Sequence, residues 1–242
     1  MFDKSLQYSF TAQKYARFRA LRVVFSVLFL FLLYNATHSF LFSVWVVRGE
    51  SMQPGLHAGD RLVVVSSALP FLFADFFGGG GAVPYSRGQI VLIDKSRQSP
   101  RNPLLVAADS VVRFFTAQQI SILGREEYIY MKRLVALPHD EISMVNFIMR
   151  VRPEGTAFAL TEFELARRPY YPTIPQVPAL WDAALPFSGN MESVALGARE
   201  SFVVSDDRSF TADSRTWGPI DRDVIIGRPV FRFWPLTRIG FL

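Results

Sequence analysis

The chain has 242 residues, enough for one sizeable domain or one domain with an insertion. Half of the residues are hydrophobic and only 19% are charged, which excludes a disordered or fibrous protein and points toward a membrane. The formal net charge of +5 suits nucleic acid or an anionic lipid surface, and the lack of cysteine excludes disulfides, thiolate metal sites and a cysteine nucleophile.

The first predicted element is an apolar helix. Residues 23–47 contain no Asp, Glu, Lys or Arg, and a helix of that length could cross a hydrocarbon core of roughly 30 Å. Basic residues dominate 1–22, so the positive-inside rule places this terminus in the cytoplasm. A signal peptide is the alternative, but the stretch is long and no small-residue cleavage site follows it. We therefore expect one transmembrane helix over 23–47.

A second apolar segment, 69–77, is too short to span a bilayer and contains Asp75. Its phenylalanines either fill the core or contact lipid, and the two interpretations have about equal weight. The glycine run 78–81 is not followed by Gly-Lys-Ser/Thr, so a phosphate-binding loop is not expected.

Beyond residue 48, short runs of branched and aromatic residues alternate with turn signals, which predicts a mainly β fold of antiparallel sheets. The expected strands cover residues 61–65, 89–93, 128–131, 201–204 and 224–226, and one helix is expected around 105–119. Six prolines between Pro153 and Pro186 predict an inserted, irregular sub-domain over 146–199. The β domain would then comprise 48–145 and 200–242.

Few residues can carry chemistry. The three histidines share no ligand spacing, and the acids between residues 206 and 223 fit no EF-hand loop, so we expect no metal and no cofactor. Ser51 lies four residues beyond the apolar segment. Strand alternation puts Lys132 on the same face as Tyr130 and Leu134, where a buried charge is costly, unless its ammonium snorkels to water.

Four motifs occur in order, and together they resemble those of bacterial type I signal peptidases. They are Ser51-Met52-x-Pro54, Gly59-Asp60, Lys132-Arg133-x-Val135-x-Leu137-Pro138 with Asp140, and the segment 205–220. The resemblance covers residues 45–235. It implies a signal-peptidase-like β fold and a membrane-bound serine endopeptidase that cleaves N-terminal signal peptides from exported preproteins.

The resemblance also assigns roles to residues. Ser51 would be the nucleophile and Lys132 its general base, which requires desolvation to lower a lysine pKa that is ordinarily about 10.4. The backbone N–H of Ser51 would stabilise the oxyanion. The hydroxyl of Thr211 would orient Lys132, and Asp213 and Arg215 would form a supporting ion pair.

Substrate contacts follow from the same resemblance. Small substrate side chains would enter shallow apolar pockets, and the extended substrate would add as a strand. The expected pocket residues are Val47, Met52, Leu56, Tyr130 and Met131. The chain departs from the family pattern, which leaves local turn geometry and the role of Thr211 open; the departures are Gly49, Ala136, His139, Ser205, Asp207, Phe210 and Thr211.

The expected partners are signal-peptide-bearing preproteins, the phospholipid bilayer and a nearby secretion translocase, without nucleic acid. The expected location is the bacterial cytoplasmic membrane, single-pass, with a cytoplasmic N-terminus and an extracytoplasmic catalytic domain. A self-cleaving Ser–Lys repressor is disfavoured because the chain has no DNA-binding segment. A catalytically silent, membrane-tethered β-scaffold or binding module of the same fold remains the alternative.

Overall fold

The computed structural model describes residues 10–40, 42–67, 85–98, 102–116, 120, 122, 128–176 and 189–242. The apolar segment 69–77 and the glycine run 78–81 lie outside these residues, as do residues 177–188 of the predicted insertion.

The helices are α1 (Phe10–Phe40), α3 (Pro103–Phe115), α4 (Glu162–Leu165) and α5 (Ser214–Trp217), with short 3-10 turns η2 (Lys95–Gln98), η4 (Arg222–Val224) and η5 (Leu236–Arg238). The first strands are β1 (Phe42–Val46), β2 (Arg61–Ser66), β3 (Ile90–Asp94), β4 (Ile129–Ala136), β5 (Glu141–Val145) and β6 (Ile148–Arg152). The remaining strands are β7 (Leu160–Thr161), β8 (Met191–Ala195), β9 (Glu200–Val204), β10 (Ile220–Asp221), β11 (Ile225–Trp234) and β12 (Gly240–Phe241).

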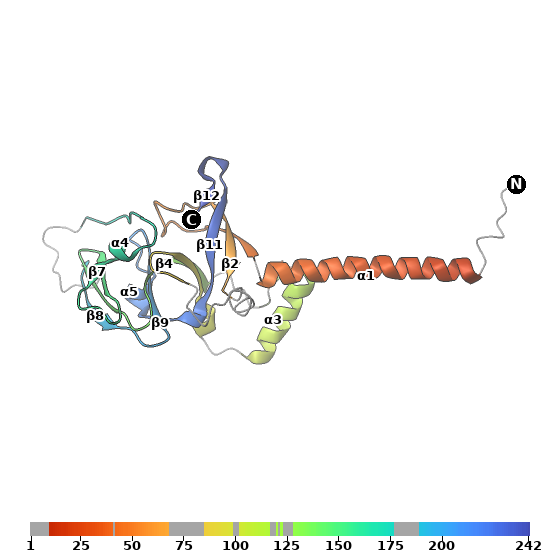
Figure 1. The fold of residues 1–242 in the computed structure, drawn as a ribbon, viewed down its shortest axis with the longest axis horizontal. Helices are drawn as coiled ribbons and strands as arrows, with labels where there is room; N and C mark the ends of the chain where they lie inside the picture. Colours follow the sequence, from red (N-terminus) through yellow and green to blue (C-terminus); the bar gives the residue numbers. More distant parts are fainter. Residues whose placement is uncertain are drawn as a thin grey trace.

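Helix α1 projects from the β domain as a long rod (Figure 1). Its apolar side chains between Val23 and Leu33 are largely exposed, and Phe29 exposes 65% of its surface. Among the described residues, no helix combines the length and the apolar character that a membrane crossing requires.

The expected helix over 23–47 is wrong at its C-terminal end. Residues Phe42–Val46 form strand β1, which pairs antiparallel with β2 from Phe42↔Val65 to Val46↔Arg61. Alternating valines around Trp45 favour a paired strand, and the pairing supplies backbone hydrogen bonds that a helix end would leave unmade. The uncharged stretch 23–47 therefore contains the end of α1 and the whole of β1.

Within the described ranges, the strands form two antiparallel sheets, which confirms the mainly β prediction. Eight strands form one sheet in the order β1-β2-β11-β3-β4-β9-β10, with β12 paired to β11, and four form a second in the order β7-β6-β5-β8. Strands β6, β7 and β8 lie inside 146–199, so the expectation that this segment is irregular is wrong for those residues. Alternating burial along β6, with Met149 and Val151 inward, explains why it pairs as a strand.

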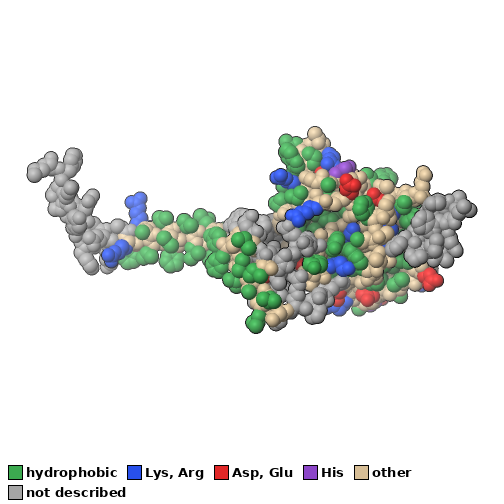
Figure 2. Space-filling view, turned by 180° about the vertical axis from the view of Figure 1, so that it is seen from behind, with side chains coloured by type: hydrophobic (Ala, Val, Ile, Leu, Met, Phe, Trp, Pro, Cys, Tyr) green, Lys and Arg blue, Asp and Glu red, His purple; other side chains and the backbone are tan. Residues whose placement is uncertain are grey.

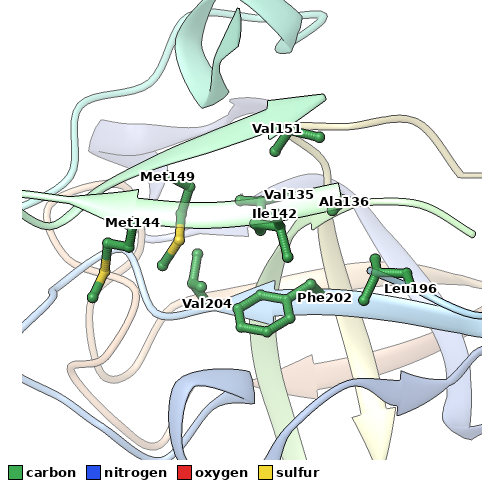
Figure 3. Close-up of a cluster of buried hydrophobic side chains, with 9 residues drawn as sticks. All are labelled: Val135, Ala136, Ile142, Met144, Met149, Val151, Leu196, Phe202 and Val204. Carbon is green, nitrogen blue, oxygen red and sulfur yellow. The ribbon is translucent and has the colours of Figure 1, made fainter. Parts of the chain in front are cut away.

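The two sheets share a hydrophobic core that reaches the ends of β4 and β9 (Figure 3). Its buried members come from both sheets and are Val135, Ala136, Ile142, Met144, Met149, Val151, Leu196, Phe202 and Val204. Strand β9 pairs with the second half of β4, with Arg133 opposite Val204. The core thus fixes the point where β9 ends and the next loop starts, directly beside Lys132.

Candidate active site

Ser51 lies in the turn that joins β1 to β2. The base of this turn is closed by hydrogen bonds from Val47 N–H to the Asp60 carbonyl and from Gly59 N–H to the Val47 carbonyl, each 2.8 Å long. Met52 and Leu56 are buried beneath the turn, while Ser51 is half-buried. The apolar residues therefore anchor the turn and leave the Ser51 side chain near the surface.

Asp60 holds the turn to the C-terminal part of the chain. Its fully buried carboxylate accepts hydrogen bonds from Arg238 Nη2 at 2.7 Å and Arg232 Nη1 at 3.2 Å. It also accepts one from the His57 backbone N–H at 3.1 Å. A buried carboxylate is stable when it is paired and hydrogen-bonded in this way.

Lys132 lies in the middle of β4, with only 2% of its surface exposed. Its neighbours on the same face are apolar, as strand alternation predicted: Tyr130 packs on Trp217 with ring centroids 5.1 Å apart, and Leu134 is buried in the core. Lys132 Nζ lies 3.2 Å from Ser51 Oγ and 2.9 Å from Ser205 Oγ. The structure thus brings together two residues that are 81 positions apart in the chain.

Burial lowers the pKa of Lys132 to about 8 from its ordinary 10.5. Desolvation is the largest cause, because it disfavours the ammonium form. The negative charges of Asp213 and Asp206 oppose this shift, and the positive charge of Arg215 adds to it. With such a pKa, about one lysine in ten is a neutral amine at pH 7.

The segment after β9 carries an ion pair beside the lysine, between the two residues expected to form one. Arg215 donates to the Asp213 carboxylate at 2.9 and 2.8 Å, and Asp213 also accepts the Ser205 backbone N–H at 2.8 Å. Burial by itself raises the pKa of Asp213, but hydrogen bonds and charge from Arg215 hold it below its ordinary value. Asp213 therefore holds this segment in place through its hydrogen bonds. Its negative charge also favours the ammonium form of Lys132.

The resemblance implied that the Thr211 hydroxyl orients Lys132, but among the described residues this hydroxyl makes no hydrogen bond to Lys132. The Thr211 backbone carbonyl accepts hydrogen bonds from the Asp213 N–H at 2.8 Å and Thr216 Oγ1 at 2.5 Å. Among the described residues, the hydroxyl that contacts Lys132 besides that of Ser51 belongs to Ser205. Sequence reasoning treated Ser205 as a replaced turn glycine and missed this contact. Its position directly after β9 was the available signal.

The same segment also touches the nucleophile turn. The Asp207 backbone N–H donates to the Ser51 carbonyl at 3.1 Å. Arg208 and Glu162, both fully buried, form an ion pair at 2.5 Å, and Arg208 Nη1 donates to the Ser205 carbonyl at 2.7 Å. Residues 205–208 therefore connect both members of the predicted dyad.

The five expected substrate contacts do not form one group. Val47, Met52 and Leu56 share a buried cluster, and Met131 packs against it. Tyr130 instead packs on Trp217. A separate cavity of about 730 Å³ borders Arg133 and Tyr170, and none of the five expected contacts lines it.

The Ser51 backbone N–H is available for a ligand. Within the described part of the chain, it has no hydrogen-bond acceptor. A Cβ added at Gly49, two residues before Ser51, would meet nothing within 4 Å. A backbone N–H donor without an acceptor can bind a developing oxyanion.

Comparisons with known proteins identify the family of this chain. The family described as signal peptidase, peptidase S26 matches residues 20–234. Signal peptidase IB of Staphylococcus aureus (strain MRSA252) is 22% identical over 220 residues, covering 90% of this chain and 91% of that protein. Signal peptidase I of Bacillus caldolyticus is 27% identical over 206 residues, covering 84% and 85%. The chain therefore belongs to the S26 family of signal peptidases.

Proposed function

We propose that this protein cleaves signal peptides from exported preproteins with Ser51 as nucleophile and Lys132 as general base. The observation that carries the proposal is the 3.2 Å approach of a buried lysine nitrogen to a half-buried serine oxygen. A lysine that merely snorkels would expose its ammonium, whereas Lys132 is 98% covered.

The reaction follows from the protonation states. Neutral Lys132 Nζ removes the Ser51 hydroxyl proton while Oγ attacks the scissile carbonyl carbon, and the Ser51 N–H stabilises the oxyanion. The lysine then gives its proton to the leaving amine, and the acyl-enzyme remains. The same lysine next takes a proton from water, whose oxygen attacks the ester carbonyl carbon. The bond between Ser51 Oγ and the acyl carbon then breaks, Lys132 returns the proton to Oγ, and the second product leaves as a carboxylic acid.

An extended substrate can add to the sheet beside the dyad. Strand β9 pairs with β4 only from Arg133 onward, and β3 occupies the other edge of β4. Among the described strands, none pairs with the second edge of residues 129–132. A preprotein segment that pairs there would run past Lys132, with Met131 and the cluster of Val47, Met52 and Leu56 as candidate pocket residues.

Although no described helix meets the requirements for a membrane crossing, the finer proposal on location is that the N-terminal segment that includes α1 holds the protein at the bacterial cytoplasmic membrane, with its N-terminus in the cytoplasm. Figure 2 shows hydrophobic side chains along the rod and basic side chains toward its far end. Arg17, Arg19 and Arg22 are exposed there, which suits anionic lipid headgroups. Alkaline extraction and protease protection of cells test this: a washable protein, or a β domain digested only from the cytoplasmic side, would contradict it.

The decisive experiment is cleavage of a purified preprotein in detergent by the wild type, S51A, K132A and K132R. The wild type should release the mature protein at a defined bond, and all three variants should be inactive while they stay folded. Arginine should not substitute because its guanidinium stays charged. An inactive, folded wild type would favour the silent β-scaffold, and an active S51A would refute the assigned nucleophile.

A further inference from the structure

Lys132 contacts a second hydroxyl, which belongs to a position that the family motif does not assign to this role. Ser205 Oγ lies 2.9 Å from Lys132 Nζ, closer than Ser51 Oγ at 3.2 Å. We propose that Ser205, in place of Thr211, is the positioning residue that aims the lysine at the nucleophile. This inference rests on the proposed Ser–Lys function and specifies which residue supports it.

Ser205 is held rigidly enough for that task. Its backbone N–H donates to Asp213 at 2.8 Å, and its carbonyl accepts from Arg208 at 2.7 Å. Each of these partners is neutralised in its own buried ion pair, Asp213 by Arg215 and Arg208 by Glu162. The Ser205 side chain is itself fully buried, so its hydroxyl has a fixed place beside the lysine.

The contact directs the lone pair of the lysine. A neutral amine has two N–H donors and one lone pair, and the Ser205 oxygen can accept one N–H. The lone pair is then free to take the proton of Ser51: the Ser51 O–H bond breaks, an N–H bond forms at Nζ, and the electron pair of Oγ forms the bond to the acyl carbon. Ser205 exchanges no proton.

The same contact stabilises the product of proton transfer. The ammonium formed at Nζ is buried, and a charged donor gains more from an acceptor than a neutral one does. Removing the Ser205 hydroxyl should therefore lower the lysine pKa further, since the ammonium loses its acceptor. It should also slow the chemical step, because the amine loses its orientation.

Thr211 lies six residues further along and bonds through its carbonyl. Removal of the Thr211 hydroxyl can therefore be compared with removal of the Ser205 hydroxyl. Ser209 provides the matched control, since it lies exposed in the same loop and contacts Asp207 only through its backbone N–H.

The experiment compares S205A, T211A and S209A with the wild type in preprotein cleavage across pH. We expect S205A to lower kcat roughly 10- to 100-fold with KM within about twofold, and to move the ascending limb of kcat to lower pH. T211A and S209A should each keep kcat within about threefold. An S205A enzyme with wild-type kcat and pH profile, or a larger loss in T211A than in S205A, would overturn the inference.

Titration of Lys132, together with wild-type cleavage, separates this inference from the proposed function. The Lys132 side-chain amine can be titrated by NMR in folded S205A and S209A, and only S205A should show a lowered pKa, whether or not the protein cleaves. If S205A does not fold, S205G takes its place, because the family motif has glycine there. An equal lysine pKa in both variants would refute the Ser205 contact, while an inactive wild type would refute only the proposed function.

Discussion

Arg133 and Asp206 form a buried ion pair next to the Lys132–Ser205 contact. Arg133 directly follows Lys132 in the chain, and Asp206 directly follows Ser205. Arg133 Nε lies 2.5 Å from Asp206 Oδ1, a second guanidinium nitrogen contacts Oδ2, and the guanidinium stacks 3.8 Å from the Tyr170 ring. Side chains alternate along β4, so this ion pair and the dyad use opposite faces of one strand. The ion pair therefore fixes the segment that carries Ser205 against the strand that carries Lys132.

Asp206→Asn should disturb both stability and catalysis. It leaves the buried Arg133 without a counter-charge, which costs roughly 3–5 kcal/mol of unfolding free energy. It also removes a negative charge that raises the pKa of Lys132. The rise of kcat/KM with pH should therefore occur at lower pH. Urea unfolding and the pH dependence of kcat/KM measure the two effects.

The matched control for that change is Asp221→Asn, which breaks the exposed pair of Asp221 with Arg199. Solvent already screens this pair, so its loss should change stability much less. Equal losses in the two variants, or an unchanged pH profile in D206N, would contradict the role given to Arg133–Asp206.

Activity should rise with pH through the titration of Lys132. Only the neutral amine acts as a base, and the pKa of Lys132 is about 8. The value of kcat/KM should therefore increase about tenfold per pH unit below 7 and level off above 9. A profile that follows a group titrating near pH 6.5, as histidine does, would exclude Lys132 as the base.

Much of the fold could be predicted because single strands leave a local signal. Alternating or continuous apolar runs located Arg61–Ser66, Ile90–Asp94 and Glu200–Val204 within one or two residues. The prolines that begin at Pro153 hid β6, which ends one residue before them. The end of α1 was missed because β1 is as free of charge as the helix, and only pairing with β2 separates the two.

Part of the site could likewise be predicted from the sequence, and part depends on the fold. The order of motifs singled out Ser51 and Lys132, although they lie 81 residues apart. The choice between the hydroxyls of Ser205 and Thr211 depends on where β9 ends opposite Arg133, which is a matter of sheet register. The ion pairs Arg133–Asp206 and Arg208–Glu162 likewise join residues 73 and 46 positions apart, beyond the reach of local patterns.

Lys132→Met should stabilise the protein while abolishing cleavage. The folded-state pKa of about 8 lies below the ordinary 10.5, so the unfolded chain binds the proton more tightly. The resulting cost, roughly 3 kcal/mol, is present in full below pH 8, declines between pH 8 and 10.5, and is absent above that range. Methionine fills similar space without a charge, so K132M should gain about 1–3 kcal/mol at pH 7.

Urea unfolding at pH 7 and pH 10 tests the sign. The advantage of K132M over the wild type should shrink at pH 10, because the wild-type lysine is then neutral in the folded state. An advantage that stays constant or grows with pH would show that burial of the ammonium is not its cause.

Gly88 supports the Arg133 side of the site, and its replacement should be costly for two separate reasons. Its φ of +82° disfavours any residue with a Cβ, and a Cβ there would lie 2.7 Å from Ala166 Cβ and 2.9 Å from Ala166 Cα. The Gly88 carbonyl also accepts a hydrogen bond from Arg133, and its N–H donates to Leu134 at 2.8 Å. A shift of this turn would therefore reach β4 directly.

Gly155 separates conformational strain from crowding. Its φ of +76° is similar, but an added Cβ would meet nothing within 4 Å. Gly155→Ala should lower the unfolding free energy by roughly 1 kcal/mol from strain alone. Gly88→Ala should lower it by roughly 2–4 kcal/mol, because overpacking adds to the same strain, and should also reduce kcat through displacement of β4. Equal destabilisation in the two variants would mean that Ala166 moves aside and that the turn at Gly88 does not brace β4.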